Sequence, residues 1–380
     1  MNRDDLLIRG IRPGPILISR GRIAEIGPGA DAAATAETRR IEADGLLAVP
    51  GFIELQVNGA AGHDLTRDPT AVWRVGEALP RYGVTTFLPT IISSPPETIE
   101  TARRVLMEGP PRDYAGASAL GLHLEGPFLN ATYAGAHQSA NLRHPDSRTA
   151  AGWSPGAGVR MVTLAPELPG GLDLVAQLAQ RGLLVAAGHS AATLSEARAA
   201  VEAGVRYGTH LFNAMPPLDH RAPGLVGALL LDDRVTIGLI VDGHHLDPAV
   251  VALAWRLAGP GRVSLVSDAM AALGQGPGQY RVAEAEVTVD ETGARLQDGR
   301  LAGSVLALDE ALGNLVATTG CSAGDAVATV TTTPARLLGL LDRAKLERGA
   351  RADLVLLNST LRVAAGFVAG RLAYQVEGLM

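Results

Sequence analysis

Short apolar runs recur through the middle of the chain and alternate with segments of helical periodicity. One such helical segment spans residues 194–201. Apolar strands that alternate with helices favour a parallel sheet covered on both faces, and about eight such units match a closed (β/α)₈ barrel. An open doubly wound sheet is the alternative, but the glycine fingerprint G-x-G-x-x-G does not follow the first run. The runs are 46–57, 84–92, 119–124, 159–164, 183–187, 207–212, 235–241 and 263–266.

The two ends of the chain have a different pattern. Residues 6–29 and 352–374 contain short apolar stretches between turn residues, without a helical period. We therefore predict an α/β protein with a small β-sandwich domain formed by residues 1–46 and 350–380, and a TIM-like barrel over 47–349. Within the barrel domain, residues 274–303 indicate an inserted β-hairpin, and a helix over 306–317 closes the barrel.

Composition narrows the class of protein. The 380 residues are 47% hydrophobic, which is enough for one large core and a small accessory domain. Net charge is -6 and the basic residues are scattered, so we expect no nucleic-acid partner. Cys321 is the only cysteine, which fits a reducing compartment. The charged start resembles no signal peptide, and no apolar run reaches a membrane span. We expect a cytoplasmic protein without a membrane partner.

Polar and ionisable side chains gather where the predicted strands end. In a (β/α)₈ barrel the carboxyl ends of the strands and their loops form one mouth, where barrel enzymes carry their chemistry. Any one of these residues alone is more often structural. Their coincidence at one end of successive strands predicts a shared site. The residues are Gln56, Asn58, His123, Glu125, His189, His210, Asp242, His245 and Asp268.

Three of these residues suit a catalytic metal. Glu125, His189 and His210 offer one carboxylate and two imidazoles from three strands, and leave a position for water. With no thiolate among them, Zn²⁺ and Fe²⁺ both fit this set. Asp268, after the last strand, is placed to accept a proton from that water. On its own Asp268 would instead be read as a helix cap or turn carboxylate.

Longer motifs surround these positions. They are PGFIELQVNG at 50–59, GLHLEGPF at 121–128, AGHS at 187–190, GTHLFNAM at 208–215, VDGHH at 241–245, VSDAM at 266–270 and LAGS at 301–304. Together with the closing segment 349–355, they resemble the N-acetylglucosamine-6-phosphate deacetylase family, in the single-metal branch of the amidohydrolase superfamily. The resemblance runs over almost the whole chain.

The resemblance implies an activity and a role for each matching position. The activity is hydrolysis of the acetamide of N-acetylglucosamine 6-phosphate to glucosamine 6-phosphate and acetate, with one divalent metal ion per subunit. Glu125, His189 and His210 are implied to bind the metal, and Asp268 to shuttle the proton. His137, in GAHQ at 135–138, is implied to help polarise the acetyl carbonyl. The implied substrate-binding residues are Ala136, His137, Asn213, Ala214, Arg221, His245, Leu301, Ala302 and Gly303.

The same resemblance implies a homodimer, because the family residue that matches Arg221 contacts the phosphate bound in the neighbouring subunit. The sequence departs from the wider pattern at two places. Gln56 and Asn58 stand where many superfamily members have His-x-His and a second metal, and a weak second site there stays open. Glu54 stands where the family usually has Asp, and we expect little functional consequence.

Three other functions stay open. Deacetylation of N-acetylgalactosamine 6-phosphate would use the same residues. Another metal amidohydrolase, acting on a cyclic amide, would use the same metal face without a phosphate. A barrel that no longer catalyses is the third, although such a protein would be expected to have lost ligands, and Glu125, His189, His210 and Asp268 are all present.

Overall fold

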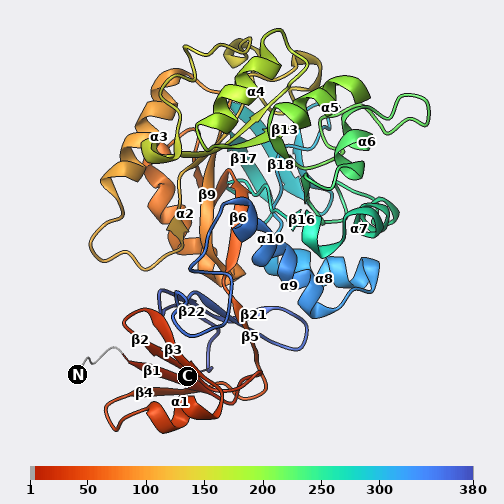
Figure 1. Ribbon diagram of the computed structural model, residues 1–380. Coiled ribbons are helices and arrows are strands. Elements are labelled where there is room, and N and C mark those ends of the chain that lie inside the picture. The colour runs from red at the N-terminus through yellow and green to blue at the C-terminus, as the bar shows by residue number, and fades with distance from the viewer. Residues whose placement is uncertain (1–4, 380) are drawn as a thin grey trace.

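The computed structural model describes residues 5–379 and is built around a ring of parallel strands (Figure 1). Neighbouring strands of the ring pair in parallel register, and the last meets the first through a bridge between Val57 and Ala269. This arrangement confirms the predicted (β/α)₈ barrel. The strands are β6 (Phe52–Val57), β9 (Val84–Ile92), β11 (Leu122–Glu125), β12 (Val159–Leu164), β13 (Leu184–Ala187), β14 (Val205–Gly208), β15 (Thr236–Leu239) and β16 (Val263–Leu265).

Helices form the outer layer of the barrel and explain why its strands are apolar throughout. Each barrel strand faces other strands inside and helices outside, so nearly all of its side chains are buried. The predicted amphipathic helix over 194–201 is α5. The helices are α2 (Val72–Ala78), α3 (Pro96–Glu108), α4 (Gly171–Gln180), α5 (Leu194–Ala203), α6 (Gly224–Leu231), α7 (Pro248–Arg262), α8 (Leu308–Thr319), α9 (Ala323–Val330) and α10 (Thr332–Leu337).

The apolar run at 46–57, predicted as one strand, is two strands. The first, β5 (Leu47–Pro50), pairs antiparallel with β20 (Leu354–Leu357), and β6 then enters the barrel. Gly51 lies between them. A Cβ at this position would lie only 2.1 Å from the hydroxyl oxygen of Thr85. The chain therefore crosses from one sheet to the other where only glycine fits.

Two small sheets pack face to face beside the barrel, and Figure 1 places β1 to β5 together with β21 and β22 there. One sheet has the order β3-β2-β1-β4 and the other β22-β21-β20-β5. Residues of both sheets share one core, which makes the pair a sandwich. The further elements are β1 (Leu6–Arg9), β2 (Ile16–Ser19), β3 (Arg22–Ile26), α1 (Pro28–Ala33), β4 (Arg39–Glu42), β21 (Val363–Val368) and β22 (Arg371–Gln375).

Strand β20 joins the sandwich to the barrel because both of its faces are buried. Leu354 and Leu356 belong to the sandwich core, whereas Val355 and Leu357 belong to the core of the barrel. This period of two is the strand geometry expected between two packed layers. Residues 1–4 and 380 of the predicted sandwich lie outside the described residues.

The insertion after the eighth strand is a three-stranded sheet, one strand more than the predicted hairpin. It comprises β17 (Gly278–Val282), β18 (Ala285–Asp290) and β19 (Gly293–Leu296), in antiparallel order. Its apolar face packs on Ile92 and Met270 near the carboxyl ends of the barrel strands. Between residues 5 and 379 no helix is both long and apolar enough to cross a membrane. The remaining short strands are β7 (Gly59–Ala60), β8 (His63–Asp64) and β10 (Ser118–Ala119).

Candidate active site

A cavity of about 370 Å³ lies at the carboxyl ends of the barrel strands. The insertion and the loop after β11 form part of its walls, beside the strand ends. Of the residues with an implied metal, catalytic or substrate-binding role, Arg221 alone does not line it; Gln56, His123 and Asp242, also predicted at the shared site, do not line it either, whereas Asn58 does. The residues with an implied role that line it are Glu125, Ala136, His137, His189, His210, Asn213, Ala214, His245, Asp268, Leu301, Ala302 and Gly303.

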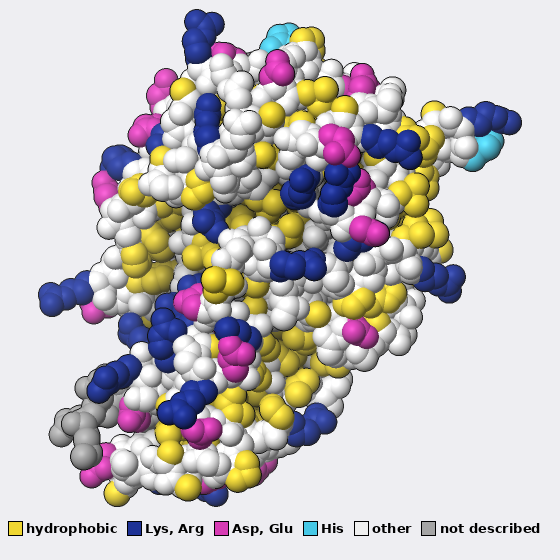
Figure 2. All heavy atoms as spheres, in the orientation of Figure 1, with side chains coloured by type: hydrophobic (Ala, Val, Ile, Leu, Met, Phe, Trp, Pro, Cys, Tyr) yellow, Lys and Arg dark blue, Asp and Glu magenta, His cyan; other side chains and the backbone are white. Residues whose placement is uncertain are grey.

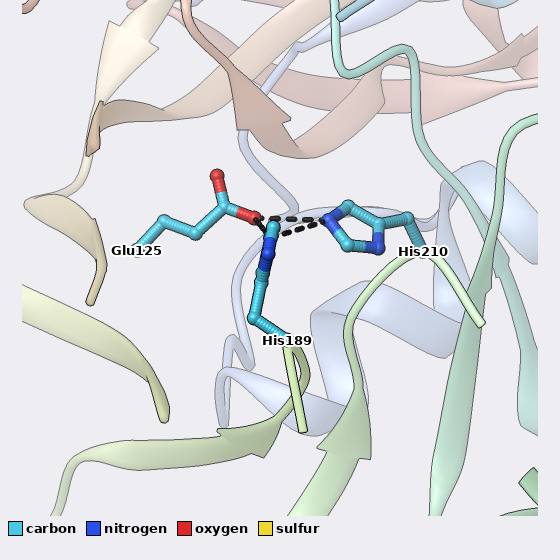
Figure 3. A group of neighbouring side chains, drawn as sticks. All are labelled: Glu125, His189 and His210. Carbon is cyan, nitrogen blue, oxygen red and sulfur yellow. Dashed lines mark hydrogen bonds and ion pairs between the residues drawn. The ribbon is translucent and has the colours of Figure 1, made fainter. Parts of the chain in front are cut away.

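Glu125, His189 and His210 converge at the floor of the cavity (Figure 3). The Nε2 atoms of both histidines lie 3.0 Å from Oε1 of Glu125 and 3.1 Å from each other. All three side chains are buried. Burial alone would raise the pKa of Glu125, but hydrogen bonds and charge from the two histidines hold it well below its usual value. The carboxylate is therefore ionised.

The donor atoms of this cluster fit a divalent metal ion. Nδ1 of His189 lies 2.8 Å from the carbonyl oxygen of Tyr133, which can only accept a hydrogen bond, so Nδ1 carries the proton. In the neutral ring that a metal ligand requires, Nε2 of His189 presents a lone pair toward the Glu125 carboxylate in a buried site. Such facing electron pairs suit a cation between them, and one carboxylate with two imidazoles is a ligand set of catalytic zinc and related metals.

The backbone is left-handed at three of these site residues. The φ angles are 51° at His189, 28° at His210 and 49° at Asp268. This conformation is uncommon for residues other than glycine, and it gathers at functional sites where surrounding contacts hold it. Each residue lies just beyond the end of its strand, so the turn redirects its side chain into the cavity.

Asp268 is held by the side-chain amides of Gln56 and Asn58. Nδ2 of Asn58 donates to Oδ1 of Asp268 at 2.6 Å, and Nε2 of Gln56 donates to the same oxygen at 3.0 Å. Gln56 Nε2 also donates to Oε1 of Glu125 at 3.0 Å. Burial, and then the charge of Glu125, raise the pKa of Asp268 to about 6. Oδ2 is left free to exchange a proton near neutral pH.

His137 is fixed in one tautomer. The backbone N–H of Ser93 donates to Nδ1 of His137 at 3.2 Å, and the Ser93 hydroxyl lies 2.9 Å from the same atom. The proton of a neutral ring must then be on Nε2, which points toward Glu125 at 3.8 Å from Oε2. Burial, and then the charge of His189, lower the pKa of His137 to about 3, so the ring is neutral. It can donate one hydrogen bond into the cavity.

The other wall of the cavity contains His245. Its Nδ1 donates to Oδ2 of Asp242 at 2.7 Å, and the backbone N–H of His245 donates to Oδ1 at 2.8 Å. This leaves Nε2 of His245 for a ligand. At the mouth, Arg300 donates from Nη1 to the carbonyl oxygen of Gly135 at 2.8 Å and pairs with Asp298 at 2.7 Å. Arg300 thus joins the insertion to the loop that carries His137.

Arg221 lies outside the lining of the cavity. It is exposed in the loop between β14 and α6, which extends away from the barrel in Figure 1. Figure 2 shows basic and histidine side chains at the tip of a protrusion on that side of the molecule. The structure therefore places Arg221 where it can meet another molecule and not its own active site.

Two buried acid–base side chains near the site have structural partners. Glu54 accepts hydrogen bonds from the backbone N–H of Gln56 at 3.1 Å and of Ser267 at 3.0 Å, which ties β6 to the segment before Asp268. Burial raises the pKa of Glu54 to about 8. His123, one of the predicted strand-end residues, bonds to Thr163 at 2.7 Å inside the barrel.

Sequence reasoning missed Ser93, which orients His137, and Arg300. Ser93 directly follows β9, so the strand-end rule that found the other residues also applied to it. Arg300 carried no such signal, because it lies on the insertion and its contact with Gly135 is not local in sequence.

Comparison with known proteins agrees with this geometry. The chain matches the Amidohydrolase family over residues 47–373. It is 37% identical to N-acetylglucosamine-6-phosphate deacetylase from Homo sapiens over 396 residues, an alignment that covers 99% of this chain and 92% of the human protein. It is also 37% identical to N-acetylgalactosamine-6-phosphate deacetylase from Escherichia coli O157:H7, over 87% of this chain and 89% of that one.

A solved structure shows the same similarity in three dimensions. It is a mutant N-acetyl-D-glucosamine-6-phosphate deacetylase from Mycobacterium smegmatis, with one aspartate changed to alanine, in complex with N-acetyl-D-glucosamine-6-phosphate. The TM-score is 0.86 at 35% identity, and the match covers 98% of this chain and 99% of the other. Both the fold and the length of the chain therefore correspond.

Proposed function

This chain belongs to the amidohydrolase family and, within it, to the N-acetylglucosamine-6-phosphate deacetylases, and from that membership we propose that it hydrolyses the acetamide of N-acetylglucosamine 6-phosphate. The products are glucosamine 6-phosphate and acetate. The observation that carries the proposal is the meeting of Glu125, His189 and His210 with Asp268 in one buried cavity. A barrel that no longer catalyses would have no use for this arrangement.

Glu125, His189 and His210 are the proposed ligands of one divalent metal ion per subunit, Zn²⁺ or Fe²⁺. When bound, such an ion lowers the pKa of water and polarises a carbonyl group. Gln56 and Asn58 direct their amide N–H groups to Asp268 and Glu125. Amide side chains are poor ligands for zinc or iron, which favours a single metal.

The protein's side chains then divide the proton transfers of the reaction. Oδ2 of Asp268 accepts a proton from the attacking water, while Gln56 and Asn58 hold Oδ1 in place. Nε2–H of His137 donates a hydrogen bond to the acetyl oxygen as negative charge develops there. When the C–N bond breaks, Asp268 returns its proton to the amine nitrogen. Acetate and the amino sugar then leave.

The phosphate of the substrate is the proposed ligand of His245, with Asn213 and Ala214 beside it on the same wall. Leu301, Ala302 and Gly303 lie on the insertion side, where we place the acetyl end, and Ala136 lines the cavity beside His137. Asp242 supports the phosphate role, because it holds the His245 ring through Nδ1 and leaves Nε2 for the ligand.

We infer a homodimer in which Arg221 reaches the phosphate in the partner's cavity. The exposed loop that carries Arg221 supports this, and so do apolar side chains around it. Leu218 is 42% exposed, Leu231 at the end of α6 is 67% exposed, and Leu253 and Leu257 of α7 are each 45% exposed. Large exposed leucines on neighbouring elements are typical of a surface that another chain covers.

Two finer points belong to the same proposal. We place the protein in the cytoplasm, since its single cysteine fits a reducing compartment. N-acetylgalactosamine 6-phosphate is the second candidate substrate, because one relative at 37% identity carries that name.

Acetate release by chelator-treated protein tests the proposal, before and after Zn²⁺ or Fe²⁺ is added back. We expect metal-dependent release from N-acetylglucosamine 6-phosphate and much less from the unphosphorylated sugar. The galactosamine epimer in parallel decides between the two candidate substrates. Protein that binds metal and releases acetate from neither phosphorylated sugar contradicts the proposed function.

A further inference from the structure

Glu167 lies in the loop after β12, where the proposed mechanism gives it no part. β12 pairs with β11 on one side and β13 on the other. The ends of those two neighbours carry Glu125 and His189. The loop of β12 therefore lies between two strands that each present a proposed metal ligand.

The Glu167 carboxylate joins the loops on both sides of it. Oε1 accepts a hydrogen bond from Nδ2 of Asn130, in the loop after β11, at 3.0 Å. Oε1 also accepts the backbone N–H of Ala191 at 2.7 Å, and Oε2 accepts the hydroxyl of Ser190 at 2.7 Å. Ser190 and Ala191 directly follow His189. One side chain thus connects three adjacent strand ends by hydrogen bonds.

These contacts surround the left-handed turn at His189. The carbonyl oxygen of His189 accepts the backbone N–H of Asn130 at 3.0 Å, and its Nδ1 donates to Tyr133 at 2.8 Å. Asn130 is therefore bonded both to His189 and to Glu167. Glu167 in turn holds the two residues that follow His189, so the turn is fixed from both sides.

Two simpler roles for Glu167 do not fit. It is not the cap of α5, because Thr193 and Glu196 form a complete capping box there. Among residues 5–379 Glu167 makes no ion pair with a basic side chain, so it is not half of a salt bridge. Its hydrogen bonds run to the two residues that follow His189 and to Asn130, whose backbone N–H bonds to the His189 carbonyl oxygen.

We propose that Glu167 is a positioning residue, which holds the His189 turn so that Nε2 of the imidazole points at Glu125 and His210. The inference rests on the proposed metal site, because the direction of Nε2 matters only if this atom binds the metal ion. It adds a residue that acts through His189 without touching metal or substrate.

Affinity for Zn²⁺ alone, measured against a chromophoric chelator, tests the inference in the full-length protein. Glu167→Ala removes all three hydrogen bonds, and we expect the Zn²⁺ dissociation constant to rise about 10- to 100-fold, as for other residues that orient a metal ligand. At saturating Zn²⁺, kcat should fall while KM stays near its wild-type value. Glu167→Gln should restore both, because its amide oxygen still accepts two N–H groups and its NH₂ can donate to Ser190.

Glu196→Ala is the matched control. It removes a carboxylate that also accepts hydrogen bonds nearby, from Thr193 N at 2.8 Å and Thr193 Oγ1 at 2.7 Å, but it serves only the cap of α5. We expect it to lower the unfolding midpoint and leave Zn²⁺ affinity unchanged. Two results would overturn the inference: wild-type Zn²⁺ affinity in Glu167→Ala, or affinity in Glu167→Gln as weak as in Glu167→Ala. Wild-type protein that binds Zn²⁺ without releasing acetate would contradict the proposed function alone.

Discussion

Among single residues, Gln56 and Asn58 determine which carboxylate oxygen of Asp268 is free to exchange a proton. Their amide N–H groups both meet Oδ1 of Asp268, so one carboxylate oxygen is occupied and the other is free. Two donors on one oxygen fix the plane of the carboxylate and favour its charged form, which opposes the effect of burial. The pair therefore orients the carboxylate that we propose as the base.

Asp268→Asn should keep metal and substrate binding and lower kcat by a factor of about 10²–10⁴, because the amide cannot accept the proton.

In the wild type, the base is lost when Asp268 is protonated, so kcat/KM should fall as pH decreases. Burial raises the pKa of Asp268 to about 6, and a bound cation lowers it, so the midpoint should lie at or below about 6. Steady-state rates across pH and metal analysis of the variant check this. Turnover near wild type in Asp268→Asn would exclude Asp268 as the base.

The positions of the site residues were predictable from the sequence, but their hydrogen bonds were not. The strand-end rule predicted that Glu125, His189, His210 and Asp268 lie together, and they line one cavity, because the barrel brings strand ends together whatever the loops do. The tautomer of His137 depends on Ser93, and the orientation of Asp268 depends on Gln56 and Asn58. Such contacts join residues far apart in sequence and are set by loop geometry.

Among the elements, β20 links two cores because its residues alternate between them. The sequence indicated a strand there, but an unbroken apolar run does not reveal which partner covers each face. The same difficulty hid the break at Gly51, where one apolar run leaves the sandwich sheet and enters the barrel. Local pattern predicted most strand positions. Which strands pair with each other across the chain was visible only in the structure.

Leu356→Ala and Leu357→Ala should each lower the free energy of unfolding by about 2–5 kcal/mol, because each leaves a cavity in a packed core. Both side chains are fully buried, one in the sandwich and the other against the barrel. Chemical denaturation measures the change. Leu341→Ala is the control, since Leu341 is 85% exposed and should change stability little. A Leu356→Ala protein as stable as this control would argue against the shared sandwich core.

At the scale of the whole molecule, the proposed dimer would complete each active site with a residue from the other chain. The described cavity contains His245 but not Arg221, which lies on an exposed loop. The division into a sandwich of residues 1–46 and 350–380 and a barrel of 47–349 stays our prediction for the domain boundaries. The pairing of β5 with β20 supports moving the first boundary to Gly51.

Mixing two variants of low activity tests the dimer. Arg221→Ala should lower kcat/KM about 10- to 100-fold, because a hydrogen bond to a charged group is worth about 1.5–3 kcal/mol. In a mixed dimer with Asp268→Asn, one site has both Asp268 and the partner's Arg221. Random exchange of subunits should therefore restore about a quarter of wild-type activity, since half of the dimers are mixed and each has one complete site. Exchange without recovery would place Arg221 outside the partner's active site.

The pairing of β5 with β20 also constrains the order in which the protein can assemble. Leu47 emerges before the barrel strands during synthesis, whereas Leu357, its partner in the register, emerges after them. Until then β5 and the apolar face of the first sheet have no covering layer, and pairing over such a separation is slow. Nascent chains are therefore exposed to aggregation through this face. A chaperone that binds apolar strands would be needed most while the barrel is still being made.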